Sequence, residues 1–184
     1  MINFLLTIQI ALLRLFFGAP DRRCYLREIQ RLLKIPVASL QRHLDLLEKA
    51  FVIVSLGGFS RNLRSEVTSK SKYYFLDNGI RNGIIQQFNK IDLRDDIGKL
   101  WENFLFIERL KYRTYKNIFA NTYFWRTYSQ QETDLVEDRG GKIHAYEYKW
   151  SEKRKSHAPT EWKTAYPDAS FSIINSSNYL EFIT

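Results

Sequence analysis

Three polar side chains in the second half of the chain have the types and spacing needed for metal-dependent chemistry. Glu147 and Lys149 are two residues apart, so an extended strand presents both on one face. A turn signal, Asp138-Arg139-Gly140-Gly141, precedes that strand and follows Asp134. A hairpin through this turn brings Asp134 roughly opposite residues 146–147. We therefore expect two carboxylates and one ammonium to meet on one sheet surface.

Two carboxylates held this close repel each other when ionised, and a divalent cation between them relieves the repulsion. Oxygen ligands suit Mg²⁺ or Mn²⁺, so Asp134 and Glu147 are the expected metal ligands, with Glu102 from a preceding helix as a third. Such an ion polarises a phosphate and lowers the pKa of a bound water, while Lys149 would orient that water or offset transition-state charge. Because a Glu-X-Lys triplet usually marks a solvated strand edge or an ion pair, the hypothesis depends on all four residues meeting.

The elements that would position these residues follow from the apolar pattern. A long helix is expected over 95–115, with Asp95 and Asp96 at its N-terminal end. The other predicted elements are strands at 122–127, 132–137 and 142–150, a helix at 158–165, and strands at 170–174 and 178–183. The expected order is therefore α-β-β-β-α-β with a short final strand.

The first half of the chain predicts two short helices and a hairpin. Residues 25–33 and 37–50 have helical apolar spacing, and Lys34-Ile35-Pro36 interrupts it. The second helix would carry an apolar stripe of Val37, Leu40, Leu44 and Leu47. Two β-rich stretches, 51–56 and 73–76, flank a polar loop. This layout is that of a winged helix-turn-helix.

The basic charge of the chain lies in this first half. Residues 1–94 hold 15 Lys and Arg against 7 Asp and Glu, so they account for the whole net charge of +8. Clustered cations favour a polyanion such as DNA. The expected DNA contacts are Ser39, Gln41, Arg42 and His43 on the second helix, and Arg61, Arg64, Lys70 and Lys72 in the loop. Winged helices are also frequent protein–protein modules, and that alternative stays open.

Residues 3–17 and the single cysteine bear on localisation. The apolar run 3–17 is too short to span a bilayer and carries Gln9 and Arg14, so we expect a core helix and no membrane association. This helix is nearly apolar all round, which suggests burial against a large surface, such as that of a second copy of the chain. Cys24 cannot form an internal disulfide and is expected to be a structural thiol. We expect a cytoplasmic protein.

An ordered series of motifs resembles the C-terminal region of prokaryotic AAA-type ATPases of the archaeal-type superfamily. The family's YSRNLR, KIYFYDTGLRN and LLENFVF signatures are similar to residues 59–64, 72–82 and 100–106. Its FWRT, EVDFV and EVK run is similar to residues 124–127, 132–136 and 147–149. The resemblance covers residues 25–174.

The resemblance implies a fold and a site. It implies a winged helix over residues 1–90 with an extra N-terminal helix, and a PD-(D/E)XK, restriction-endonuclease-like αβββαβ domain over 91–184. The expected fold class is therefore α+β or α/β. The family pattern falls on Glu102, Asp134, Glu147 and Lys149. No GxxxxGK[ST] phosphate-binding loop occurs in the chain, so we expect no ATP site and no ATPase activity.

Three functions compete at this stage. The chain could be a Mg²⁺-dependent nuclease that holds DNA with its basic first half. It could be a DNA-binding module with an inert second half. It could instead be a docking or regulatory part of an ATPase, in which case it would lack nucleic-acid affinity and expose an apolar surface near residues 3–17.

Overall fold

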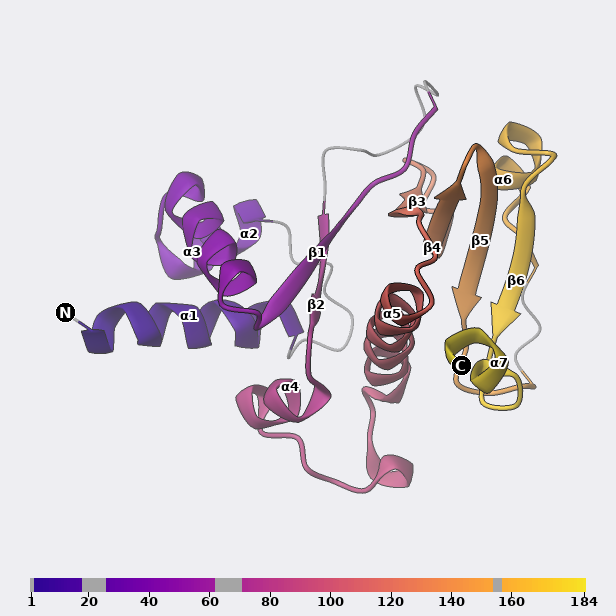
Figure 1. Ribbon diagram of the computed structural model, residues 1–184. Coiled ribbons are helices and arrows are strands. Elements are labelled where there is room, and N and C mark those ends of the chain that lie inside the picture. Colours follow the sequence, from indigo (N-terminus) through magenta and orange to yellow (C-terminus); the bar gives the residue numbers. More distant parts are fainter. Residues whose placement is uncertain (1, 18–25, 62–70, 154–156) are drawn as a thin grey trace. The chain divides into compact units, whose positions relative to one another are not determined.

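The computed structural model shows a mixed α+β protein with helices and two sheets (Figure 1). The structure describes residues 2–17, 26–61, 71–153 and 157–184. Cys24, Arg64 and Lys70 lie outside the described residues, so the predictions made for them stay predictions. The chain divides into two compact units, which we call the first unit (Met1–Val54 with Phe75–Asp96) and the second unit (Ser55–Tyr74 with Ile97–Thr184). The expected domain boundary near residue 90 stays a prediction.

The first unit contains most of the helices of the first half. They are α1 (Ile2–Phe17), α2 (Leu26–Leu33), α3 (Val37–Lys49), α4 (Asn78–Ile85) and the 3-10 helix η1 (Ile91–Leu93). Helix α1 packs against α4, and the Nε of Arg14 donates a hydrogen bond to the carbonyl oxygen of Ile84 at 2.9 Å. No helix within the described residues has both the length and the apolar character required to cross a membrane.

Helix α3 confirms most of its predicted stripe. Leu40, Leu44 and Leu47 are buried. The expectation for Val37 is wrong, because its side chain is 36% exposed in the first turn of the helix. The expectation that His43 contacts DNA is also wrong, because His43 is buried between the stripe positions and only 8% exposed.

The sequence analysis did not predict α4. Asp77 caps its N-terminus by accepting a hydrogen bond from the backbone N–H of Ile80 at 2.8 Å, the usual role of an aspartate at that position. Arg81 within the helix is 1% exposed and forms an ion pair of 2.7 Å with Asp96. Asp96 also forms an ion pair of 2.8 Å with Arg94, so Arg81, Arg94 and Asp96 form a buried charge cluster in the first unit.

The expected hairpin is present with shifted bounds. Strands β1 (Ile53–Gly57) and β2 (Ser71–Phe75) form the two-stranded sheet. Lys72 was expected in the loop between the strands; this is wrong, because Lys72 lies on β2. After β1, Gly58 forms a parallel bridge with Phe124, which attaches this part of the chain to the larger sheet of the second unit.

The larger sheet has the predicted strand sequence. Its strands are β3 (Asn121–Arg126), β4 (Glu132–Arg139), β5 (Lys142–Tyr148) and β6 (Ser170–Ile174), in the spatial order β3-β4-β5-β6. The first two pairings are antiparallel, and β5 pairs with β6 in parallel. The hairpin turn at Gly140-Gly141 is confirmed, since both glycines have positive φ.

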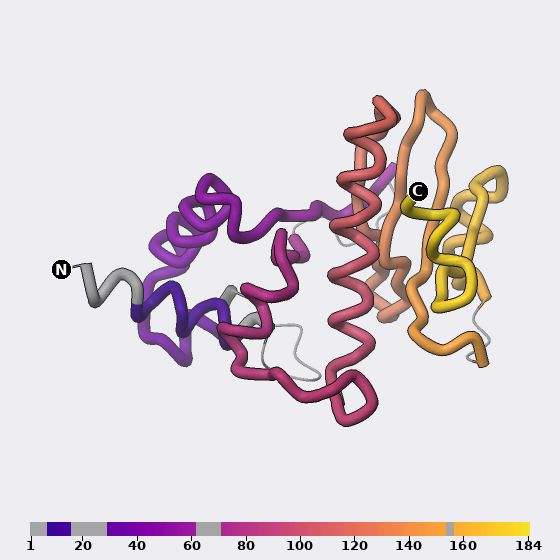
Figure 2. Tube along the Cα trace, turned by 60° about the horizontal axis from the view of Figure 1, so that its bottom comes forward, coloured from indigo at the N-terminus to yellow at the C-terminus, as the bar shows by residue number. Residues whose placement is uncertain are grey.

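Three helices complete the second unit: α5 (Ile97–Tyr115), α6 (Thr160–Ala165) and α7 (Tyr179–Ile183). The strand predicted at 178–183 is wrong. Tyr179, Phe182 and Ile183 also fit helical spacing, and the ring of Phe182 packs 4.8 Å from that of Tyr146. Figure 2 shows α5 running alongside the strands, where it contacts β5 and α7.

Different helices pack on the two faces of the larger sheet. On one face, Arg109 of α5 and Phe182 of α7 contact Tyr146. On the opposite face, Trp162 of α6 packs against Trp125 in a hydrophobic core. The other buried residues of this core are Phe59, Val136, Ile143, Ala145 and Tyr166. Strand alternation on β5 places Glu147 on the same face as Ala145, whereas on β4 the register with β3 shifts between Tyr123 and Trp125, so the alternation is interrupted between Asp134 and Val136.

Candidate functional site

Four carboxylates gather where β4 begins and β5 ends. We call them the acidic cluster: Glu102, Glu132, Asp134 and Glu147. Alternation along β4 puts Glu132 and Asp134 on one face. The antiparallel register pairs Leu135 with Tyr146, so Asp134 and Glu147 are neighbours of this pair on their strands. Glu102 arrives from the second turn of α5. The structure thus brings Glu102, Asp134 and Glu147 near one another, and their role as a shared site stays a prediction.

The cluster surrounds a lysine from β2. The Nζ of Lys72 lies 2.6 Å from Oε1 of Glu132, 3.2 Å from Oε1 of Glu102 and 3.5 Å from Oδ1 of Asp134. The same ammonium lies 5.5 Å from the ring centroid of Phe124. Burial opposes the charge of Lys72, but the surrounding carboxylates raise its pKa well above the ordinary lysine value. Lys72 is therefore the cation of this cluster. The sequence had suggested that Lys72 binds a DNA phosphate, but its ammonium is already paired with these carboxylates.

Tyr74 fixes the strand that delivers Lys72. The two residues are two apart on β2 and share a face. The hydroxyl of Tyr74 donates to Oε1 of Glu102 at 2.8 Å, and its ring lies 4.2 Å from that of Phe106 on α5. Burial and the charge of Glu102 raise the pKa of Tyr74 well above the usual tyrosine value, so the hydroxyl stays protonated and remains a donor.

Asp134 has the most perturbed acidity in the cluster. Burial raises its pKa to about 8, and the negative charges of Glu102 and Glu147 act in the same direction. Lys72 and the backbone N–H of Tyr148, which donates to Oδ2 of Asp134 at 2.8 Å, oppose the rise. A carboxyl group in this state holds a proton near neutral pH unless a further cation enters, which is typical of functional sites as well as of buried ion networks.

Lys149 is associated with Glu147. Its Nζ donates to Oε1 of Glu147 at 2.5 Å, just beyond the end of β5. Burial raises the pKa of Glu147, and the ion pair with Lys149 opposes the rise. All four residues predicted for catalysis thus lie in one region of the second unit, with Lys149 held on Glu147.

Sequence reasoning missed Glu132, Tyr74 and the role of Lys72 in this site. Period-2 alternation could have joined Glu132 to Asp134, and Lys72 to Tyr74. It could not have shown that β2 reaches β4, because that contact spans 62 residues from Lys72 to Asp134.

The expected DNA contacts lie elsewhere. On α3, Gln41 and Arg42 are exposed and Ser39 is half-buried, on the side opposite the buried leucine stripe. The amide of Gln41 donates to Asp45 at 3.3 Å, one turn along the same helix. Arg61 is about half exposed and forms an ion pair of 3.2 Å with Asp138 near the end of β4.

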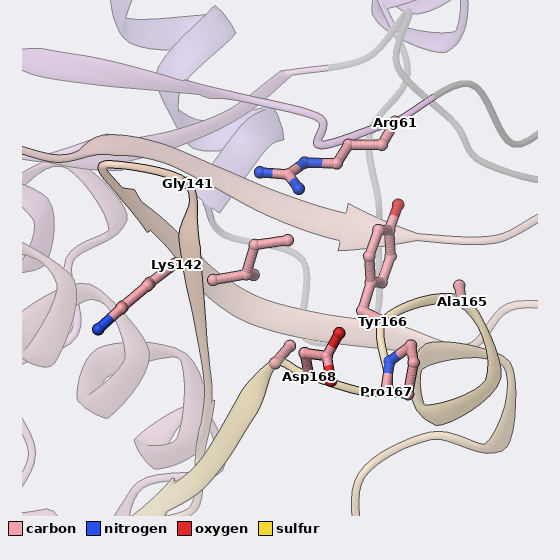
Figure 3. A pocket seen from close by; sticks show the side chains of 9 residues that line it. Arg61, Gly141, Lys142, Ala165, Tyr166, Pro167 and Asp168 are labelled. Atoms are coloured by element: carbon pink, nitrogen blue, oxygen red, sulfur yellow. The ribbon is translucent and has the colours of Figure 1, made fainter.

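A cavity of about 340 Å³ lies beside Arg61, and no residue of the acidic cluster lines it. Figure 3 shows Arg61 and Tyr166 on its wall, together with Asp168 and Pro167 from the segment that leads into β6. The side chain of Lys142 extends away from the other lining residues (Figure 3). This arrangement leaves the acidic cluster as the stronger candidate for chemistry.

Among the described residues, no group of three or more His, Cys, Asp or Glu side chains is arranged to hold a metal ion as the structure stands. The acidic cluster nevertheless fits Mg²⁺ in the chemistry of its donors, since all four are hard carboxylate oxygens. The ammonium of Lys72 stands where a cation is attracted, and its N–O distances are those of hydrogen bonds. The carboxylates are therefore spaced for an ammonium, whose contacts are longer than the ~2.1 Å of a magnesium–oxygen bond.

Comparison with known proteins places two family models on the chain. A domain of unknown function, DUF4143, matches residues 97–182, and a second, DUF8612, matches residues 10–91. The first match begins at the first residue of α5 and covers the larger sheet with its helices. It therefore includes Glu102, Asp134, Glu147 and Lys149, while Lys72 lies within the second match.

Two curated relatives are similar to the chain: the uncharacterized protein Mb2031c of Mycobacterium bovis and the uncharacterized protein Rv2008c of Mycobacterium tuberculosis. Each is 27% identical over 124 residues, which is 66% of this chain and 27% of the relative. The chain thus spans about a quarter of the length of these relatives. No solved structure matches the chain. The comparisons therefore show similarity to two domains of unknown function, each over less than half of the chain.

Proposed function

We propose that the second unit is a restriction-endonuclease-like module that uses Mg²⁺ to hydrolyse phosphodiester bonds of DNA. We further propose that the chain is the C-terminal portion of an AAA-type ATPase-family protein, and that its residues 1–90 form a winged helix that binds DNA. The observation that carries the nuclease proposal is the meeting of Glu102, Asp134 and Glu147, with Lys149 held on Glu147. The element order α5-β3-β4-β5-α6-β6, with β6 parallel to β5, supports the same fold.

The proposed roles follow from the contacts. Asp134, Glu147 and Glu102 would hold the ion, which when bound supplies a polarised phosphate and a more acidic water. Lys149 donates to Glu147 and keeps an ammonium beside the position of a reacting phosphate, where it offsets developing negative charge. The backbone N–H of Tyr148 fixes the orientation of the Asp134 carboxyl.

The exposed face of α3 supports DNA association of the first unit. Gln41 and Arg42 are exposed beside one another, and the leucine stripe holds the helix from the other side. An exposed arginine and amide on a second helix are suited to phosphate and base contacts.

A cleavage assay tests the nuclease proposal. Wild type, Asp134→Asn and the control Asp168→Asn are incubated with duplex and single-stranded DNA in Mg²⁺ or Mn²⁺. Asp168 is exposed and lies outside the acidic cluster, so its variant removes one carboxylate from the same unit without touching the cluster. Cleavage by wild type and Asp168→Asn, with at least a hundredfold loss in Asp134→Asn, is expected. Equal rates for all three proteins would sink the proposal.

A second candidate function is a non-catalytic module of an ATPase that binds DNA or a protein partner. The ammonium of Lys72 favours it, because an internal cation already lies against the carboxyl groups of Glu102 and Asp134. This candidate predicts salt-dependent DNA binding without cleavage, and affinity unchanged by Glu147→Gln. A purely protein-binding version, with an ATPase core or a second copy docking at residues 3–17, predicts no DNA affinity.

A further inference from the structure

The cation that the acidic cluster holds is part of the chain itself. Lys72 forms ion pairs with Glu102, Glu132 and Asp134, and its side chain is only 22% exposed. Two of these partners, Glu102 and Asp134, are proposed ligands of Mg²⁺. We propose that Lys72 is an intramolecular competitor for the divalent cation: its ammonium holds the cation position of the acidic cluster, and a divalent ion binds only as Lys72 leaves. This inference rests on the metal site of the proposed function and adds a control over its occupancy.

The competition follows from shared oxygens. Oε1 of Glu102 already accepts hydrogen bonds from Lys72 at 3.2 Å and from Tyr74 at 2.8 Å. A metal ion held by Glu102 and Asp134 would need at least one oxygen of each carboxylate at about 2.1 Å, with a lone pair directed at the metal. An ammonium and a divalent ion sharing the same carboxylates would also lie within a few ångströms of each other, where their repulsion in a buried setting is strong.

The structure allows the ammonium to move while its strand stays in place. Tyr74 anchors β2 through Glu102 and through its ring contact with Phe106. Lys72 reaches the cluster through a flexible four-carbon stem, and its ammonium also lies over the ring of Phe124. Glu132, which has the shortest contact with Lys72 and is not among the proposed metal ligands, offers a place where the displaced ammonium stays paired.

Calorimetric titration with MnCl₂ tests the competition on the full chain. The variants are Lys72→Met, which removes the competing charge, and Lys142→Met, a matched control at an exposed lysine of the same unit that lies outside the cluster. We expect Lys72→Met to bind Mn²⁺ at least tenfold more tightly than wild type, and Lys142→Met to bind as wild type does. Equal or weaker binding by Lys72→Met, or binding by neither protein, overturns the inference.

A second measurement uses wild type alone and so does not depend on the folding of a variant. Lysine acetylation by a small amine-reactive ester is followed residue by residue by mass spectrometry, with and without saturating MnCl₂. Displacement predicts faster acetylation of Lys72 in Mn²⁺ and an unchanged rate at Lys142. An unchanged or slower rate at Lys72 contradicts displacement.

The two proposals fail in different ways. Tighter Mn²⁺ binding by Lys72→Met without any DNA cleavage leaves the competition standing and removes the nuclease function. Cleavage that depends on Asp134, with the same Mn²⁺ affinity in wild type and Lys72→Met, keeps the nuclease function and removes the competition.

Discussion

The ammonium of Lys72 on β2 lies 3.5 Å from the carboxyl group of Asp134 on β4, although 62 residues separate them in the sequence. This contact joins the hairpin strand β2 to the acidic end of the larger sheet. The charge balance of the acidic cluster therefore depends on both segments.

Asp134→Asn should change how stability depends on pH. The folded state raises the pKa of Asp134 to about 8 by burial and by the charges of Glu102 and Glu147, so it keeps a proton that the unfolded chain releases near pH 4. The contribution of Asp134 to stability is therefore full below about pH 4 and is lost as the pH rises through about 8. The amide of the variant cannot ionise, so the unfolding free energy of Asp134→Asn relative to wild type should rise with pH, by on the order of 4 kcal/mol between pH 5 and 9.

Melting temperatures measured in EDTA at pH 5, 7 and 9 check this. A difference between the two proteins that stays constant across the series would show that Asp134 is not crowded by negative charge.

Glu137→Gln should strongly destabilise the second unit. Glu137 is fully buried and accepts from Nε and Nη2 of Arg109 at 2.9 and 3.1 Å. Arg109 also donates to the carbonyl oxygen of Phe182 at 2.6 Å, which ties α5 to α7. Burial opposes ionisation of Glu137, but Arg109 and Arg139 lower its pKa, so the pair is ionised. Removing one charge leaves Arg109 buried and unpaired, at a cost of roughly 3–5 kcal/mol.

The surface pair Glu108–Lys111 provides the matched control, since its side chains are 32% and 49% exposed. Glu108→Gln should cost less than about 0.5 kcal/mol in the same urea-unfolding measurement. Comparable losses in the two variants would mean that the buried pair contributes no more than a surface one.

Asp96→Asn should destabilise the first unit at neutral pH and lose that effect in acid. Hydrogen bonds from Arg94, and then from Arg81, lower the pKa of Asp96 to about 2. The stabilisation it provides is present above the unfolded pKa near 4 and is lost as the pH falls through about 2. We expect a loss of about 1–3 kcal/mol at pH 7, shrinking below pH 4. Thermal melts followed by circular dichroism at pH 7 and pH 3 measure this loss of stability. A larger loss at pH 3 than at pH 7 would contradict the stabilising role of the ionised Asp96.

Arg42→Ala should weaken duplex DNA binding about equally for unrelated sequences if its contact is to phosphate. The slope of log affinity against log salt should fall by about 1. Lys90→Ala, at an exposed lysine after α4, is the control and should bind as wild type does. Fluorescence anisotropy across a salt series gives both quantities, and identical curves for Arg42→Ala and wild type would remove α3 from the proposed interface.

The sequence predicted most of the second unit because its signals are local. The turn at Gly140-Gly141, the alternation of β4 and β5, and β6 over 170–174 each follow from neighbouring residues. The segment 178–183 was misassigned because its apolar spacing fits a strand and a helix, and the packing of Phe182 on Tyr146 decides between them.

The site itself was predicted only in part. The grouping of Asp134 with Glu147 follows from hairpin register, and Glu102 was placed from the preceding helix. The role of Lys72 depends on a contact between distant segments, which no local pattern encodes. For the same reason His43 was taken for a surface residue, when the packing of α3 buries it.

The most direct test of the central claim is the position of Mn²⁺ in crystals of the wild-type chain grown or soaked in MnCl₂. We expect an anomalous-scattering peak within about 2.5 Å of carboxylate oxygens of Asp134 and Glu147, with the ammonium of Lys72 moved off Asp134. The proposed metal site would be contradicted by a map at saturating Mn²⁺ that has no peak at these carboxylates and shows Lys72 still paired with Glu102 and Asp134.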